Sequence, residues 1–234
     1  MDLESFNTSR ESLVPLLALN NKSNKNIIIF PTDKEAIEFS TDFSNLNKNI
    51  FHLPSWDTLS YDSFVPSFDI QGKRLEIAHL LLTNNNYNIA TSIKAISQRI
   101  YFEELEICKI ELNEEIDFDS LIENLIHLKY QRKDRVESKG SFAIRGGQLD
   151  VYPINYDLPL RVIFDGDLVN EIKTFDTISQ RSVSEKKDIL IVPATELFQI
   201  KHSDILNLSS DKKENLYDYE LFQYSQNLDL EKWL

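Results

Sequence analysis

The sequence has little of what most catalytic sites require. One cysteine, Cys108, stands among 234 residues, so no disulfide can form within the chain and a zinc site built on several thiolates is excluded. The four histidines are scattered, and none has the H-E-x-x-H spacing of a metal-binding helix. We expect Cys108 to be buried and inert, and His79, within an apolar helical stretch, to be structural.

Glycine is also scarce, with five in the chain, and this bears on nucleotide binding. A phosphate-binding loop needs G-x-x-x-x-G-K-[ST], so that backbone N–H groups can surround the phosphates. Gly72-Lys73 is followed by Arg74, and Ser67 stands where the first glycine should be. A G-x-G-x-x-G turn is missing too. The sequence therefore predicts no cofactor, no metal and no catalytic residue.

Positive charge is in deficit, because 25 Lys and Arg against 38 Asp and Glu give a net charge of −13. Phosphate neutralisation supplies the affinity of most nucleic-acid binders, so this balance argues against a dedicated DNA or RNA coat. Paired carboxylates such as Glu103-Glu104 are more typical of a solvated face than of acid–base chemistry. Long apolar runs and an N-terminal signal are also missing, which predicts a cytoplasmic protein without membrane association.

The first hundred residues predict an α/β domain. Runs of β-branched residues predict strands at 26–30, 50–53 and 87–91. The expected helices cover 13–19 and begin at Thr32, with Glu35 in a capping-box position, at Asp69 and near Ile93. Strands alternating with helices predict a parallel sheet.

The composition changes near residue 102. Residues 103–123 hold nine acidic residues and one lysine, and a helix is expected from about Asp119 to Leu128. The basic run at 129–139 follows. A last buried strand at 189–192 is expected to return the chain to the first sheet, and the final forty residues are expected to be helical or loose.

Between these segments, residues 140–177 predict β-hairpins. A Gly-Gly break separates two strands after Arg145, and Asp165-Gly166-Asp167 is a strong hairpin signal. Arg145 and Arg161 are expected to point outward together, beside an exposed Phe164. Arginine is enriched at binding hot spots because it offers a planar donor fork and an apolar stem. From these residues alone, arginines merely solvated on a hairpin are the favoured interpretation, and a binding patch is the alternative.

Six ordered motifs resemble the N-terminal UvrB-homology region of bacterial transcription-repair coupling factors and, more distantly, UvrB. The resemblance runs from about residue 26 to 198. The motifs are W-D-T-L-x-Y-D-x-F-x-P at Trp56–Pro66, D-I-x-x-x-R-L at Asp69–Leu75, I-x-A-I-x-Q-R at Ile93–Arg99, F-x-x-R-G-x-x-L-D-V-Y-P at Phe142–Pro153, F-D-x-x-S-Q-R-S at Phe175–Ser182 and P-A-x-E at Pro193–Glu196. In the first motif we expect Trp56 to be buried under a helix.

The resemblance implies a fold and a domain order. It implies an α/β class fold, in which a degenerate helicase-like (RecA-like) domain without a P-loop is interrupted by a small α+β domain of the UvrA-binding type. The expected boundaries are 1–102 for the first part, 103–178 for the inserted domain and 179–234 for the return. The chain stops at Leu234, short of the polymerase-binding and motor domains of the whole factors.

The resemblance also implies a partner, UvrA, and a role in transcription-coupled nucleotide excision repair. The family binds UvrA through exposed arginines and a neighbouring aromatic, which match Arg145, Arg161 and Phe164, with Ile163 beside them. RNA polymerase and double-stranded DNA are implied partners of the whole factor through regions outside this chain. The chain itself is expected to be no enzyme, since the ATP-dependent translocase lies elsewhere in the factor.

Three alternatives stay open. The same face can serve regulation, because in the family a distant C-terminal domain masks it. The α/β domain can be a weakly DNA-binding remnant of a helicase, which the net charge disfavours. An unrecognised enzyme is a further alternative, against which the missing phosphate, metal and nucleophile motifs argue.

Overall fold

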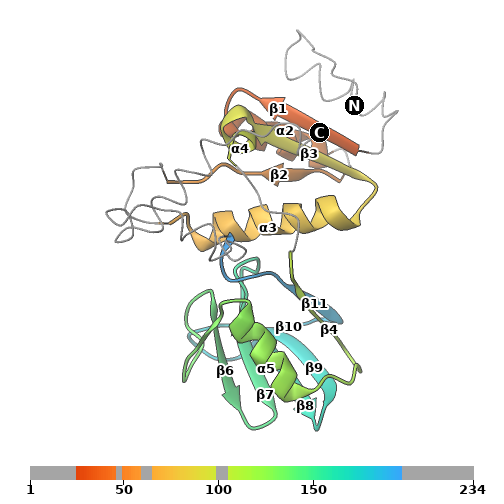
Figure 1. Ribbon diagram of the computed structural model, residues 1–234, viewed down its shortest axis with the longest axis vertical. Coiled ribbons are helices and arrows are strands. Elements are labelled where there is room, and N and C mark those ends of the chain that lie inside the picture. Colours follow the sequence, from red (N-terminus) through yellow and green to blue (C-terminus); the bar gives the residue numbers. More distant parts are fainter. Residues whose placement is uncertain (1–24, 46–48, 59–64, 99–104, 197–234) are drawn as a thin grey trace, which may run out of the picture. The chain divides into compact units, whose positions relative to one another are not determined.

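The computed structural model describes residues 25–45, 49–58, 65–98 and 105–196 (Figure 1). The chain divides into two compact units, which are described separately below. The first contains the described residues up to Pro66 and those from Ile77 to 98, and the second contains Ser67–Glu76 and 105–196. The helix expected at 13–19 lies outside the described residues. Of the last forty residues, the structure describes only 195 and 196, which belong to the second unit.

The first unit is built on a parallel sheet of β1 (Lys25–Phe30), β2 (Phe51–Leu53) and β3 (Tyr87–Ser92). The strand order is β1-β3-β2, so β3 lies in the middle. The three strands expected from the β-branched runs and their parallel pairing are thereby confirmed. Strands of a parallel sheet that are buried on both faces usually contain continuous apolar runs. The central strand β3 fits this rule, because Ile89 and Ala90 are both buried.

Helix α2 (Asp33–Ser44) begins as the sequence predicts. The Thr32 hydroxyl accepts a hydrogen bond from the Glu35 backbone N–H at 3.3 Å and donates to the Glu35 carboxylate at 3.0 Å. This reciprocal cap satisfies a backbone donor that the first helical turn leaves unpaired. The helix buries Phe39 and Phe43, and the Phe39 ring lies 4.9 Å from that of Phe30 in β1.

A carboxylate ties the ends of the three parallel strands together. Asp33 follows β1, and it accepts hydrogen bonds from the backbone N–H of Ser55, after β2, at 3.3 Å and from the hydroxyl of Ser92, at the end of β3, at 2.8 Å. The Ser55 hydroxyl donates to it as well. Burial alone would raise the pKa of Asp33, but the serine hydrogen bonds outweigh it and hold that pKa below its ordinary value.

The loop after β2 buries Trp56, as expected, with 5% of its surface exposed. Its backbone N–H donates to the Gln98 side chain at 2.7 Å, and its carbonyl accepts from Lys94 at 3.0 Å. Lys94 lies in the short helix α4 (Ile93–Ile96). The W-D-T-L and I-x-A-I-x-Q-R motifs therefore meet in the first unit, where they hold the loop.

Helix α3 (Phe68–Thr83) contributes residues to both units. In the second unit, the guanidinium of Arg74 is fully buried and donates through Nε to Glu196 at 2.8 Å. Gly72 lies against the backbone of Ile154, where a Cβ would come within 2.4 Å of the carbonyl oxygen. Glycine is required at 72 for this close approach, which gives the only Gly-Lys pair of the sequence a packing role.

The second unit is built on a six-stranded sheet of order β10-β9-β8-β7-β6-β5. All neighbours are antiparallel except β5 and β6. The strands are β5 (Gln131–Arg132), β6 (Ser141–Arg145), β7 (Gln148–Tyr152), β8 (Leu160–Asp165), β9 (Leu168–Phe175) and β10 (Ser182–Glu185). Both hairpins expected from the glycine signals are confirmed, and Gly146 and Gly166 have the positive φ angles that such turns favour.

The strand expected at 189–192 does not return to the first sheet. It forms β11 (Asp188–Ile191), which pairs antiparallel with β4 (Cys108–Glu111) inside the second unit. The prediction was wrong because a short apolar run indicates that a strand is buried but carries no information about which distant strand it pairs with.

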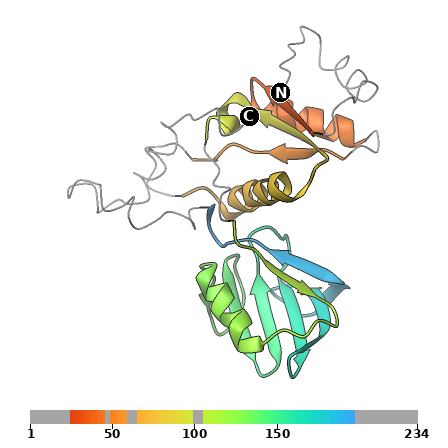
Figure 2. The same ribbon diagram turned by 45° about the vertical axis from the view of Figure 1, so that its right-hand side comes forward.

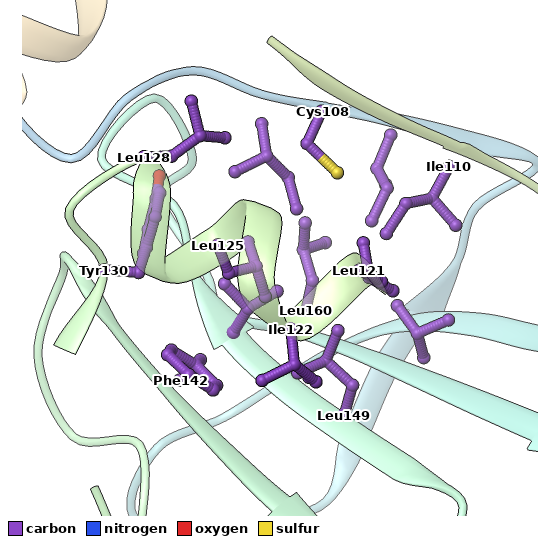
Figure 3. Close-up of a cluster of buried hydrophobic side chains, with 14 of the residues drawn as sticks. Cys108, Ile110, Leu121, Ile122, Leu125, Leu128, Tyr130, Phe142, Leu149 and Leu160 are labelled. Atoms are coloured by element: carbon purple, nitrogen blue, oxygen red, sulfur yellow. The ribbon is translucent and has the colours of Figure 1, made fainter. Parts of the chain in front are cut away.

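Helix α5 (Phe118–His127) covers one face of the six-stranded sheet (Figure 2). The Asp117 carboxylate caps it by accepting from the Ser120 backbone N–H at 2.7 Å. Figure 3 shows apolar side chains of α5 and of the strands meeting in one core, including Leu121, Ile122, Leu125, Phe142, Leu149 and Leu160. Cys108 belongs to this core, and burial, followed by the charge of Glu114, raises the pKa of its thiol to about 11. The expectation of a buried cysteine is confirmed.

Candidate protein-binding surface

The face of the six-stranded sheet opposite α5 is here called the outer face. Successive side chains of a strand point to opposite faces, so the residues between the core positions lie on it. Two rows of directly paired residues cross this face. One row is Arg145, Gln148, Ile163 and Glu171, and the next is Ala143, Asp150, Arg161 and Lys173. The sheet register thus places Arg145 of β6 on the same face as Arg161 and Ile163 of β8, with β7 between the two strands.

Arg145 ends β6 with an exposed side chain. Its guanidinium donates to the main-chain carbonyl of Asp134 at 3.2 Å. The turn that follows is tight at Gly147, where an added Cβ would come within 2.9 Å of the Phe164 carbonyl oxygen. At Gly146, by contrast, nothing lies within 4 Å of the Cβ position. The role of Arg145 in binding stays a prediction.

Arg161 lies on the same face but, unlike Arg145, is held by several contacts within the fold. Its guanidinium donates to both oxygens of the Asp150 carboxylate, at 2.7 and 2.9 Å, and lies 4.4 Å from the centre of the Phe175 ring. Gln180 accepts two further hydrogen bonds from it at 3.3 Å. With 16% of its side chain exposed, Arg161 is fixed by the fold, and the bond to Asp150 raises its pKa. It presents only one edge of its guanidinium to solvent.

Phe164 was expected to be exposed beside the arginines, and this expectation is wrong. Only 7% of its surface is exposed, and its ring packs edge-on against that of Phe118 at 4.9 Å between centroids. Phe164 follows Ile163 in β8, so the alternation of the strand turns it into the core beneath α5. The half-buried Ile163 is the apolar side chain that shares the outer face with the arginines.

The structure adds a turn that the residues alone did not single out. Between β9 and β10, the Asp176 carboxylate accepts from the Ser179 backbone N–H at 2.7 Å, and the Asp176 carbonyl accepts from the Gln180 N–H at 2.8 Å. Arg135 donates to two carbonyls of this turn. The F-D-x-x-S-Q-R-S motif was the available signal, because aspartate three residues before serine is a usual way to close such a turn.

The basic run at 129–139 contributes to this surface in part. Arg135 reaches the turn after β9, but Lys139 binds Asp69 at 2.5 Å and the Ile154 carbonyl at 3.1 Å. Lys139 therefore belongs to the contacts that hold α3 in the second unit.

Other kinds of site find no support in the part of the chain that the structure describes. Within it, no group of three or more His, Cys, Asp or Glu side chains is placed to hold a metal ion. No helix in the same residues is long and apolar enough to cross a membrane.

Residues 108–197 match the family described as the UvrB interaction domain. The segment that contains the outer face is therefore similar to this class of interaction domains. This agrees with the geometry, because the sheet presents the exposed Arg145 and the half-buried Ile163 on one face.

Much of the chain is similar to transcription-repair-coupling factors, as its motifs indicate. It is 28% identical over 204 residues to the factor of Escherichia coli (strain K12), covering 82% of this chain and 18% of that factor. It is 31% identical over 158 residues to the factor of Myxococcus xanthus, covering 66% and 13%. It is also 24% identical over 190 residues to UvrABC system protein B of Thermosipho africanus (strain TCF52B), covering 74% of this chain and 28% of that protein. The chain thus spans less than a fifth of the two coupling factors.

Proposed function

We propose that this chain is a recruiting module of transcription-coupled nucleotide excision repair, which binds UvrA through the outer face and performs no catalysis itself. The match of residues 108–197 to the UvrB interaction domain and the kinship with transcription-repair-coupling factors support this role. RNA polymerase and double-stranded DNA are, in this proposal, partners of other parts of a whole coupling factor.

The observation that carries the proposal is the state of Arg145. It is exposed, its partner within the described residues is a main-chain carbonyl, and Ile163 lies in the same row of the sheet, across Gln148. A guanidinium without a carboxylate retains most of its capacity for charged hydrogen bonds, which are the stronger kind. Such a group beside an apolar side chain has the composition of a binding hot spot.

This arrangement defines the complementary surface. The chain carries a net charge of −13, but the outer face offers arginine, so a partner must meet it with a local acidic patch. We expect the affinity for UvrA to fall as salt concentration rises, because exposed charge pairs are screened.

The test is binding of the purified chain to UvrA, measured by calorimetry for wild type and Arg145→Ala. Loss of a hot-spot side chain costs about 2 kcal/mol or more, so we expect an affinity loss of about 30-fold. The free energy of unfolding should change by no more than about 0.5 kcal/mol, since Arg145 is exposed. Lys109→Ala is the matched control, because it removes an exposed cation from β4 in the other sheet of this unit.

Two results would contradict the proposal. A folded wild type that does not bind UvrA would refute the recruiting role. Equal losses for Lys109→Ala and Arg145→Ala would show that overall charge, rather than the outer face, governs binding. Arg161→Ala is a poorer probe, because Arg161 holds Asp150 and Gln180 in place and its removal alters the fold as well as the surface.

A further inference from the structure

The turn between β9 and β10, residues 176–181, is unusually well fixed for an exposed connection. Two backbone hydrogen bonds close it, from the Asp176 N–H to the Arg181 carbonyl at 3.0 Å and from the Gln180 N–H to the Asp176 carbonyl at 2.8 Å. The Gln180 side chain donates back to the Thr177 carbonyl at 2.8 Å. The turn is therefore held in one shape before any partner arrives.

Two arginines from other segments contact this turn. Arg135 donates to the Thr177 carbonyl at 2.9 Å and the Ile178 carbonyl at 3.3 Å, and Arg161 of β8 donates to the Gln180 carbonyl at 3.3 Å. Arg145 of β6 does not contact the turn through these bonds, but it donates to the carbonyl of Asp134, the residue before Arg135. The turn is thus held by Arg135 and Arg161, and the segment that contains Arg135 also contacts Arg145.

The residue that this turn presents is apolar. Ile178 is 87% exposed, the highest value among the large apolar side chains of the described residues. Its neighbours Thr177 and Ser179 are polar, so hydrophobic burial within the turn does not account for an isoleucine there. An exposed isoleucine on a rigid support loses little conformational freedom when a partner buries it.

We propose that Ile178 is the apolar anchor of the surface, inserting into an apolar pocket of UvrA whose rim carries carboxylates that meet Arg145. This inference rests on the proposed function and names the side chain that enters the partner. The Arg145 cation selects an acidic rim, and the isoleucine, 87% exposed, selects a dry pocket. Central apolar residues surrounded by polar contacts that exclude water are the usual arrangement of an interface hot spot.

The test compares Ile178→Ala with Ile126→Ala in binding to UvrA by calorimetry. Ile126 is 54% exposed on α5, which covers the opposite face of the sheet, so the control makes the same chemical change away from the outer face. We expect Ile178→Ala to weaken binding by about tenfold or more and Ile126→Ala to leave it unchanged. Both variants should melt like wild type, because neither side chain is buried.

Salt dependence separates the anchor from the cations. Ile178→Ala removes no charge, so the slope of affinity against salt concentration should stay that of wild type, whereas Arg145→Ala should flatten it. Arg135→Lys keeps the charge but not the fork that bridges two carbonyls, and should weaken binding less than Ile178→Ala does.

The outcomes distinguish this inference from the proposed function. If Arg145→Ala weakens binding and Ile178→Ala does not, the recruiting role stands and the anchor is refuted. If the folded wild type fails to bind UvrA, both are refuted. A loss with Ile178→Ala alone, with the wild-type salt slope, supports the anchor.

Discussion

The two faces of the six-stranded sheet are built from the same strands and are stabilised in different ways. Toward α5, Val162 and Phe164 of β8 enter a continuous apolar core. Toward the outer face, Arg161 and Ile163 of the same strand lie in rows where hydrogen bonds and an ion pair join neighbouring strands. The position of a residue in the alternation of a strand therefore decides which face of the sheet it joins, and its contacts on that face decide whether it is available to a partner.

A second contrast lies within the outer face. Arg161 is held by a carboxylate, an aromatic ring and a glutamine, whereas Arg145 touches one carbonyl. Two arginines that look equivalent in the sequence thus differ in what their removal would test. Arg161 fixes the surface, and Arg145 is free to add new contacts.

The largest effect in this comparison is expected from Phe164→Ala. Truncation of a buried phenylalanine removes its burial and leaves a cavity, which costs about 3–5 kcal/mol. Urea unfolding followed by circular dichroism should show that loss. Ile163→Ala, the adjacent residue on the outer face, is the control and should cost about 1 kcal/mol, because Ile163 is half-buried. Equal losses for the two residues would contradict the division into faces.

A smaller effect is expected from Asp150→Asn. Asp150 is 5% exposed and accepts hydrogen bonds from Arg161 and Gln148, so the amide leaves a guanidinium without its counter-charge. We expect the free energy of unfolding to fall by about 1–3 kcal/mol. Asp165→Asn makes the same change in the exposed hairpin turn, where Asn-Gly suits the turn as well as Asp-Gly does, and should have little effect. If both variants unfold alike, the ion pair does not stabilise the outer face.

The smallest effect is expected from a comparison of thiol reactivity on the two faces of the sheet. At pH 8, Cys108, with its pKa raised to about 11, has about one thiol in a thousand ionised and lies in the core, so it should resist iodoacetamide in the folded protein. In Ile163→Cys, the outer-face thiol should react first, and mass spectrometry of peptides can assign the site. Both thiols should react after unfolding in guanidinium chloride, which serves as the control. Rapid modification of Cys108 in the native protein would show that the core side is open.

Local elements were predictable because local patterns specify them. The Thr32 cap, the Gly-Gly and Asp-Gly turns, and the strand at 148–152 all depend on residues close together in the sequence. The pairing of β11 with β4 could not be predicted, because it joins segments about 80 residues apart and no local signal identifies a partner strand.

Phe164 is a different case, since the sequence held the answer. Leu160, Val162 and Phe164 alternate with Arg161 and Ile163, so a strand over these residues must put the aromatic ring opposite the arginine. The expectation of an exposed Phe164 came from its place beside the arginines on a hairpin and overlooked this period of two. The role in partner binding that the resemblance implies for Phe164 stays a prediction, and its buried ring limits that role to supporting the surface from below.

The sequence by itself determined the α/β class, the two hairpins, the buried cysteine and the kinship with transcription-repair-coupling factors, because these depend on turn chemistry, periodicity and ordered motifs. The tertiary structure decided that Arg161 is locked by Asp150, that β11 joins β4, and that Ile178 is exposed on a turn held by Arg135 and Arg161. Those features arise from sheet register and from contacts between residues far apart in the chain. The contribution of an arginine to stability depends on which carboxylate or carbonyl the fold brings within hydrogen-bonding distance.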